Sequence, residues 1–265
     1  MTDNEQCDKK IWHDDDKIED AGHHNYFIEH GFTVIRDVIS RANLKDVGNE
    51  IHYINSNYDK LMTNVRVIGK RNPLLPSYDL EDESYNGKSF IRKVTGFRQI
   101  SERLRRKLSA NEIVMTVLHN ILGSKIYIYR DALMFKPARI GQEKPWHQDA
   151  VYWPFRPMNA VSAMIAVDNT CIENGCLKVI PRSHYHVYKH YKNNDELMLN
   201  VKEENHDIVY IELNPGDCLV FHSLLLHASE ANTSHMHRKL SICTYTGTDV
   251  QLECGENYLE LISEI

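Results

Sequence analysis

From residue 125 onward the chain consists of short segments rich in β-branched and aromatic residues, with turn residues between them. Segments of this kind are typical of the strands of an all-β barrel or sandwich. The preceding residues have helical spacing, and helices followed by many strands favour a mainly β protein with flanking helices. The predicted strands are residues 126–135, 161–167, 177–180, 208–213, 218–221 and 239–246.

The first helices are also readable from local signals. Residues 21–30 are expected to form a helix that ends at Gly31, because glycine adopts the left-handed conformation common at helix C-termini. Ser40 is the predicted N-cap of a second helix, which extends to about Tyr58. Two further strands are predicted at 32–38 and 89–94, and an irregular loop at 61–88.

Two more helices are predicted before residue 125. Apolar residues at every fourth position indicate the first of them (Ile100, Leu104 and Leu108). The sequence Ser-Ala-Asn-Glu at 109–112 has the pattern of a capping box, with Ser109 as the N-cap of a helix closed by Gly123. The apolar face predicted for this helix consists of Ile113, Val117 and Ile121.

Composition narrows the class of protein. The 265 residues carry a formal net charge of -6 and no basic block, so no nucleic-acid partner is expected. The longest uncharged apolar run, 160–167, is too short to span a bilayer, and no targeting signal is evident, so we expect a cytoplasmic protein without membrane contact. None of the six cysteines forms a C-x-x-C pair, which indicates reduced structural cysteines.

One domain is expected to follow a short tail. Residues 1–20 contain eight acidic residues against three lysines and few apolar ones, which is typical of a solvated and disordered segment. Residues 21–265 are long enough for a single β domain. The sequence does not predict an oligomeric state.

The segment 144–155, KPWHQDAVYWPF, carries the first functional signal. His147 and Asp149 are two positions apart, and side chains at i and i+2 of an extended segment project to the same side. With a third ligand, such a pair forms the two-histidine, one-carboxylate site of non-heme Fe(II). The pair alone is also compatible with a polar turn, and His13 begins a second H-x-D sequence in the acidic tail.

Residues 214–245 contain the complementary groups. His227 is the candidate third ligand, and Arg238 follows eleven residues later. Arg238 is in phase with Leu240 and Ile242 on a predicted strand, so it is expected to lie on an apolar face. A buried arginine needs an anionic partner, and the guanidinium fork suits a carboxylate. A small dicarboxylate would place one carboxylate on the metal and the other on Arg238.

The segments HQDAVYWPFRP, NGCLKVIPRSH and GDCLVFHSLLLHASEANTSHMHRK resemble the phytanoyl-CoA dioxygenase family of Fe(II)- and 2-oxoglutarate-dependent oxygenases. The resemblance extends from about residue 26 to 247. It implies a double-stranded β-helix (a jelly-roll or cupin-like barrel) with iron at one end. The implied iron ligands are His147, Asp149 and His227. The implied 2-oxoglutarate residues are Arg238, Ser229 and Lys93.

One position departs from the family pattern, and another is left open between two residues. Relatives carry a tryptophan in the strand after H-x-D, where this chain has Ile165. A methionine that contacts the co-substrate in the family corresponds to Ala132 or Met134. Packing on that side of 2-oxoglutarate is therefore expected to differ.

The resemblance implies hydroxylation of a C–H bond in a small molecule or an acyl-CoA, with release of succinate and CO2. The implied cofactors are Fe(II), 2-oxoglutarate and O2, with ascorbate as a supporting reductant. Related halogenases lack the carboxylate ligand, so Asp149 favours hydroxylation. Two alternatives remain: a non-oxidative cupin-like metal protein (a lyase, isomerase or binding module) and a catalytically silent barrel used for protein contacts.

Further aromatic residues and histidines are secondary candidates. Tyr152 and Trp153 are candidate pocket residues, although aromatic residues after a strand are more often core. His222 is expected to face away from His227 as a packing histidine, and His184 to hydrogen-bond within a loop. The His23-His24 pair and the histidines at 235 and 237 are expected to be exposed. Residues 184–207 are expected to form an insertion over the barrel mouth and, with 61–88, to set substrate specificity.

Overall fold

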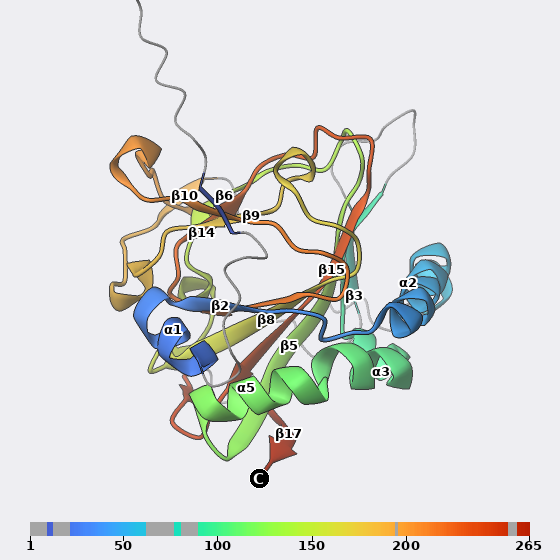
Figure 1. Ribbon diagram of the computed structural model, residues 1–265, viewed down its shortest axis with the longest axis horizontal. Helices are drawn as coiled ribbons and strands as arrows, with labels where there is room; N and C mark the ends of the chain where they lie inside the picture. The colour runs from blue at the N-terminus through green and yellow to red at the C-terminus, as the bar shows by residue number, and fades with distance from the viewer. Residues whose placement is uncertain (1–9, 13–21, 62–76, 81–89, 194–195, 254–258) are drawn as a thin grey trace, which may run out of the picture.

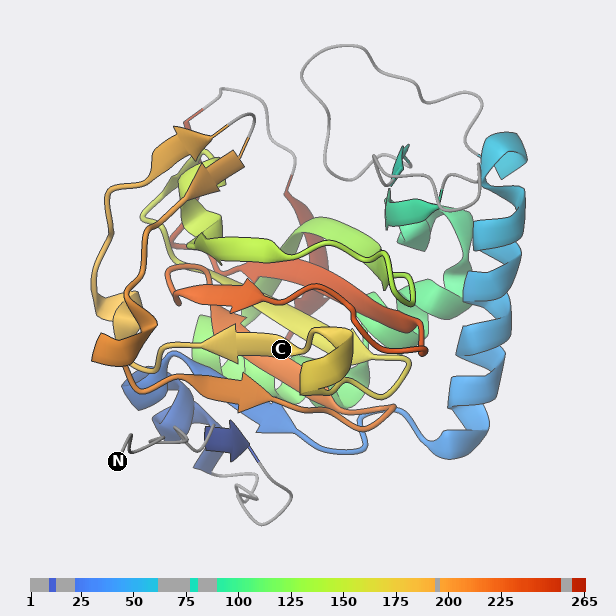
Figure 2. The same ribbon diagram turned by 90° about the horizontal axis from the view of Figure 1, so that it is seen from above.

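Two β-sheets face each other, and helices cover the outer side of the larger sheet (Figures 1 and 2). The computed structural model describes residues 10–12, 22–61, 77–80, 90–193, 196–253 and 259–265. The larger sheet has the order β2 (Phe32–Ile35), β13 (Cys218–His222), β8 (Ala160–Ala166), β15 (Arg238–Thr246), β5 (Lys125–Lys136), β4 (Ile91–Thr95) and β3 (Ser77–Leu80), with β17 (Glu260–Glu264) also paired to β5.

The smaller sheet carries most of the residues of interest. Its order is β1 (Lys10–Trp12), β12 (Val209–Ile211), β9 (Leu177–Val179), β14 (His227–Ser229) and β6 (Lys144–His147). All pairs in both sheets are antiparallel except β1 with β12. Two further ladders are β10 (Tyr191–Asn193) with β11 (Glu196–Met198), and β7 (Phe155–Arg156) with β16 (Gln251–Leu252).

The helices lie against the outer face of the larger sheet and at its side. They are α1 (His23–His30), α2 (Arg41–Leu61), α3 (Phe97–Ile100), α4 (Glu102–Leu104), the π-helix η3 (Arg105–Ser109) and α5 (Glu112–Leu122). Single 3-10 turns follow at η4 (Asp149–Tyr152), η5 (Ile172–Asn174), η6 (Ser183–Tyr185) and η7 (Glu203–Asn205). No helix within the described residues is long and apolar enough to cross a membrane.

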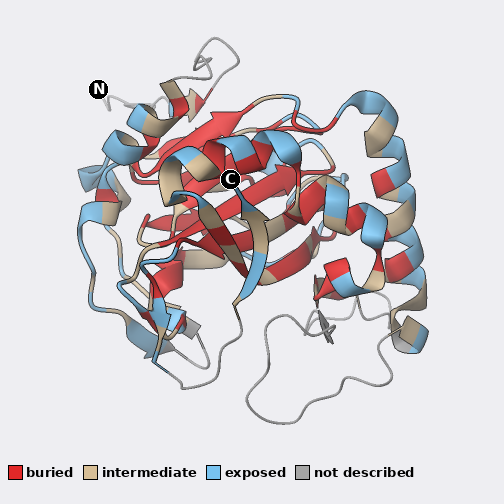
Figure 3. Cartoon of the chain, turned by 90° about the horizontal axis from the view of Figure 1, so that it is seen from below, coloured by how far each residue is buried: buried red, intermediate tan, exposed pale blue. Residues whose placement is uncertain are grey.

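The strand pairing shows which side chains of the larger sheet face the smaller sheet (the inner face) and which face the helices (the outer face). Lys93, Met134, Leu240 and Ala166 are directly paired across β4, β5, β15 and β8, so they share one side. Leu240 and Ala166 belong to the apolar cluster between the two sheets, with Met134 packed against it. The alternate residues, such as Ile165, belong to the cluster that packs against the helices. Figure 3 shows the buried helix faces turned toward this sheet.

The six strands predicted after residue 125 all form, with bounds that shift by one or two residues. In the first half, Gly31 ends α1 in the left-handed conformation, at φ 82°. The Ser40 hydroxyl accepts a weak bond from the Asn43 amide at 3.5 Å before α2, as a cap would. Most of the predicted loop 61–88 lies outside the described residues; within it, β3 forms an unpredicted strand.

The predicted capping box is wrong. Ser109 is the last residue of η3, and its hydroxyl donates back to the Arg105 carbonyl. Asn111 caps α5 instead, accepting from the amides of Ile113 and Val114 at 3.1 and 3.2 Å. The helix therefore starts later than predicted. Its buried face includes Val114 and Leu118, while Ile113 is 48% exposed.

Two segments expected to be solvated are partly buried. Lys10–Trp12 lies within the predicted acidic tail but forms β1, and Trp12 packs against Tyr26 and Phe32 at ring distances of 5.2 and 5.5 Å. One large aromatic side chain next to an open sheet edge outweighs the polar composition around it. The rest of the tail lies outside the described residues. His23 is also buried, with its Nδ1 2.8 Å from the Thr33 hydroxyl.

Candidate functional site

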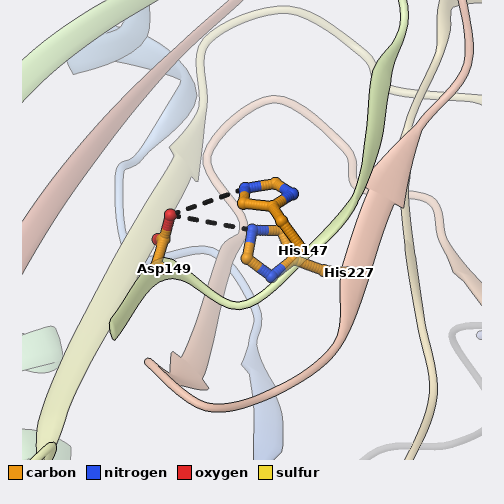
Figure 4. A group of neighbouring side chains, drawn as sticks. All are labelled: His147, Asp149 and His227. Atoms are coloured by element: carbon orange, nitrogen blue, oxygen red, sulfur yellow. Dashed lines mark ion pairs between the residues drawn. The ribbon is translucent and has the colours of Figure 1, made fainter. Parts of the chain in front are cut away.

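Three potential metal ligands converge at one end of the smaller sheet. His147 is the last residue of β6, Asp149 the first of η4, and His227 the first of β14, directly paired with His147. Asp149 Oδ1 is 3.6 Å from His147 Nε2 and 4.0 Å from His227 Nε2 (Figure 4). All three side chains are buried, and one ligand atom from each lies within 4.8 Å of the others.

Backbone carbonyls fix both imidazoles in the orientation that metal binding requires. His147 Nδ1 is 2.8 Å from the Pro145 carbonyl, and His227 Nδ1 is 2.9 Å from the Leu225 carbonyl. Each Nδ1 therefore carries the proton, which leaves the Nε2 lone pair directed at the centre of the site. Burial, assisted by His147, lowers the pKa of His227 to about 4. His227 is thus neutral near pH 7, the state that binds a metal.

Arg130 orients the carboxylate. Its Nη2 is 3.4 Å from Asp149 Oδ2, so Oδ1 is left facing the two histidines. Burial alone would raise the pKa of Asp149, but Arg130 and the two histidines outweigh burial and hold this pKa well below its usual range. The guanidinium is itself held by the Thr244 hydroxyl at 3.1 Å and lies 4.9 Å from the Trp153 ring. Arg130 was not predicted, although its phase on β5 is that of Ala132 and Met134.

Gln148, between the two ligands in sequence, was also missed. Its side chain is fully buried and points away from the histidines, as alternation along an extended segment requires. Its amide donates to the His186 and Leu224 carbonyls at 2.7 and 2.6 Å and accepts from the Tyr188 amide at 2.9 Å. The inserted segment 184–207 is therefore anchored to the strand that carries His147. Whether it covers the barrel mouth stays a prediction.

A buried cationic side chain lies along the same inner face. Arg238 begins β15 and is 7% exposed, as its apolar phase predicted. Its Nη1 donates to the Gly175 carbonyl, while its buried Nε has no hydrogen-bond partner in the described part of the chain. Burial lowers the pKa of Arg238 to about 10, and the Cys176 side chain opposes this effect. Ser229 follows His227 by two positions on β14, which places both side chains on one side.

The remaining predicted co-substrate positions divide between the two faces. Lys93 lies on the inner face, paired with Met134 in the row that includes Leu240. Met134 and Ala132 share this face. Ile165 lies on the outer face and packs toward the helices, so its side chain points away from the face that carries the predicted co-substrate residues.

The two predicted pocket aromatics differ in environment. Tyr152 is 39% exposed, its ring is 6.1 Å from the His147 ring, and its hydroxyl bonds the backbone of Leu197 in the insertion. Trp153 is buried and packs against Tyr129 and Phe155, as a core residue does.

The two secondary histidines do not join the metal site. His222 ends β13, on a different strand from His227, and its ring lies 5.5 Å from His184 and 6.2 Å from Phe27. The expected direction away from His227 is correct, although the two are not on one continuous strand. His184 hydrogen-bonds the Ile28 carbonyl, as a loop residue was predicted to do. The rings of His235 and His237 are exposed, as expected.

The residues present fit Fe(II) and 2-oxoglutarate. Two imidazole nitrogens and one carboxylate oxygen on one side match the facial ligand set of non-heme iron and leave the other side for further ligands. The unpartnered Nε of Arg238 fits a carboxylate, which would also compensate its buried charge.

Comparisons with known proteins identify the family of this chain. The profile of the phytanoyl-CoA dioxygenase (PhyH) family matches residues 27–240. The peroxisomal phytanoyl-CoA dioxygenase of Bos taurus is 29% identical over 233 residues, which are 83% of this chain and 66% of that protein. The chain thus spans slightly less than two thirds of the length of that relative.

Two solved structures share the fold. The non-heme monooxygenase ThoJ, in its apo form, superposes with a TM-score of 0.72 and 19% identity, covering 91% of this chain and 84% of that one. EctD from S. alaskensis, with 2-oxoglutarate and 5-hydroxyectoine, gives a TM-score of 0.69 and 22% identity, covering 92% and 81%. The architecture is the predicted double-stranded β-helix. Since the family profile extends from α1 to β15, the protein belongs to the phytanoyl-CoA dioxygenase family.

Proposed function

We propose that this protein is an Fe(II)- and 2-oxoglutarate-dependent oxygenase that hydroxylates a C–H bond of a small molecule or an acyl-CoA thioester. His147, Asp149 and His227 would hold the iron. Arg238, Ser229 and Lys93 would bind 2-oxoglutarate.

The observation that carries this proposal is the spacing of two complementary sites on one inner face. Ser229 lies two residues from His227 along β14, roughly 7 Å by strand geometry. The two carboxylates of a five-carbon dicarboxylate have a comparable separation. One end of such a molecule would reach the metal ligands, while its other end would reach the buried Arg238 guanidinium.

The residues of this chain would bind and orient the reactants. Iron, 2-oxoglutarate and O2, when bound, supply the oxidant that converts a C–H bond to an alcohol, with release of succinate and CO2. The Nδ1–H bonds keep both imidazoles aligned, and Arg130 holds Asp149 with one oxygen toward the metal. Apolar residues such as Phe221, whose ring is 5.1 Å from the His227 ring, exclude water. Asp149 fills the position a halide would need, which favours hydroxylation.

The rival function is a non-oxidative cupin-like metal protein. A metal site alone does not need a buried arginine with an unpartnered Nε, and such a group is costly to retain. The Arg238 pocket therefore favours the oxygenase.

The deciding experiment is an anaerobic titration. Fe(II) and then 2-oxoglutarate are added to the purified protein, and the weak visible charge-transfer band of the chelate is recorded. We expect a band that is lost in His227→Ala and weakened in Arg238→Ala, followed by succinate release in air. A folded wild-type protein that gives no band would favour the non-oxidative reading.

The second part of the proposal concerns the class of substrate. Tyr152 supports a pocket beside His147 that is bounded by the insertion, because it is part-exposed and bonded to Leu197. A CoA thioester would favour a basic rim, and the insertion carries His190, Lys189, Lys192 and Lys202. His190 accepts a bond from the backbone amide of Gln148 at 3.0 Å. Lys189, Lys192 and Lys202 are exposed.

Succinate release should be screened with acyl-CoA thioesters and with the corresponding free acids. A CoA substrate would lose affinity when the three exposed lysines are replaced together by alanine. A free-acid substrate would not respond to this triple variant.

A further inference from the structure

We propose that Lys136 is a positioning residue of the co-substrate pocket. It directs the Ser229 hydroxyl and, together with Arg238, holds the distal carboxylate of 2-oxoglutarate. This inference rests on the proposed function, because it assigns a role within the same pocket. Lys136 is not among the residues that the sequence resemblance implied.

Lys136 lies directly across from Arg238. It is the last residue of β5, and its Cα is paired with that of Arg238 on β15. Opposed side chains lie on the same side of a sheet, and like charges in this position destabilise it. Both side chains are buried, at 6% and 7% exposure, which adds to the cost. An anion bound at this point would convert the repulsion into attraction.

The Lys136 ammonium determines the direction of the hydrogen bond to Ser229. Its Nζ is 2.8 Å from Ser229 Oγ and also donates to the Glu230 carbonyl. An ammonium has three donors and no acceptor, so Ser229 Oγ must accept in this bond. The hydroxyl proton of Ser229 is then directed to a second acceptor. On the inner face beside Arg238, that acceptor is a carboxylate oxygen.

Two glycines leave the space that the Lys136 side chain occupies. A Cβ at Gly141 would collide with the Lys136 side chain, and one at Gly175 would collide with the Glu230 carbonyl and lie 3.0 Å from Lys136 Nζ. Gly175 has φ 76°, and its carbonyl also accepts from Arg238. One glycine turn therefore packs against both cations.

The arrangement predicts selection for the remote carboxylate. Two positive charges and one oriented O–H would face the end of the ligand that does not touch the metal. A 2-oxo acid without a distal carboxylate would contact the same iron ligands and gain nothing from Lys136.

The test measures binding of two probes by the anaerobic titration: 2-oxoglutarate, and 2-oxopentanoate, which lacks the distal carboxylate. For Lys136→Met we expect the Kd of 2-oxoglutarate to rise about 10- to 30-fold, while the Kd of 2-oxopentanoate changes less than about twofold. In turnover, KM for 2-oxoglutarate should rise with little change in kcat. Lys45→Met, at an exposed lysine on α2, controls for net charge.

Two further variants separate charge from hydrogen-bond direction. Lys136→Gln keeps a donor to Ser229 without the charge, so it should weaken 2-oxoglutarate less than Lys136→Met, and it serves if the methionine variant does not fold. Ser229→Ala should weaken 2-oxoglutarate several-fold in the wild-type background but have little effect in Lys136→Met, because the hydroxyl is no longer directed.

The outcomes distinguish the two proposals. If both Lys136 variants bind 2-oxoglutarate with the Kd of the wild type, the role of Lys136 is overturned and the proposed oxygenase function stands. Equal weakening of both probes also overturns it, since Lys136 would then support the fold or the metal site. Absence of 2-oxoglutarate binding by the wild-type protein overturns the proposed function itself.

Discussion

The two halves of the inner face have opposite chemical character. The metal end presents only acceptors toward its centre: the Nε2 atoms of His147 and His227 and one oxygen of Asp149. The other end presents donors, from Arg238 and Lys136 through Ser229. Each group of like character is unfavourable when buried alone. The proposed iron, chelated by one end of 2-oxoglutarate while the second carboxylate of that molecule binds at the other end, would offset both.

The two ends also differ in what supports them. The metal end is held by backbone carbonyls and by Arg130, so its geometry exists before any ligand binds. At the other end, Arg238 Nε has no hydrogen-bond partner among the described residues, and burial lowers the pKa of this arginine. We therefore expect the first end to determine whether iron binds and the second to determine which oxo acid joins it.

The largest effect is predicted for removal of a ligand at the metal end. Partners one layer outside a metal site already contribute 10- to 100-fold to metal affinity. Asp149→Ala and His227→Ala should therefore each reduce bound iron and hydroxylation by more than about 10²-fold. Iron is measured by titration of the anaerobic protein, with the exposed His206→Ala as control. Full hydroxylation by Asp149→Ala would refute the ligand assignment.

Next in size is the loss of the guanidinium at the anion end. Arg238→Met removes a charge-assisted contact worth about 2–3 kcal/mol, so the Kd of 2-oxoglutarate should rise about 30- to 100-fold while iron binding is retained. The same variant removes a buried charge. Its urea midpoint without ligands should equal or exceed that of the wild type. A less stable variant would show that Arg238 supports the fold rather than the ligand.

Sequence reasoning found the metal end because its signals are local. His147 and Asp149 are two residues apart on one extended segment, and Arg238 was found from its phase with Leu240 and Ile242 on one strand. Arg130 and Lys136 were missed since their roles depend on contacts between β5 and other elements, namely with Asp149 on η4 and with Ser229 on β14. The capping box at Ser109 failed for a related reason: several residues near that helix start are capable caps, and packing selected Asn111.

A smaller effect is predicted for the group that orients the carboxylate. Arg130→Met should lower iron affinity about 10- to 100-fold. In protein saturated with iron, the Kd of 2-oxoglutarate should change less than about twofold, because the anion end is intact. Loss of Arg130 also removes the main group that holds the pKa of Asp149 down. As the pH is lowered, protons should therefore compete with iron for Asp149 at a higher pH in the variant than in the wild type. Equal losses of iron and 2-oxoglutarate would show that the two ends are not separable.

The smallest effect concerns His222, which packs beside His184 instead of joining the metal ligands. Burial, then His184, lowers the pKa of His222 to about 4. The unfolded chain takes up this proton near pH 6.5. The stability that buried, neutral His222 contributes is therefore fully present above pH 6.5 and is lost as the pH falls toward 4. When the pH is lowered from 7 to 5, the free energy of unfolding of the metal-free protein should fall by about 1–2 kcal/mol less in His222→Gln than in the wild type, measured with urea.

The control is His52→Gln, at an exposed residue on α2, which should follow the wild-type curve. Identical pH dependence in all three proteins would mean that His222 is protonated without cost in the folded state. Its environment would then be open to water, unlike that of His227.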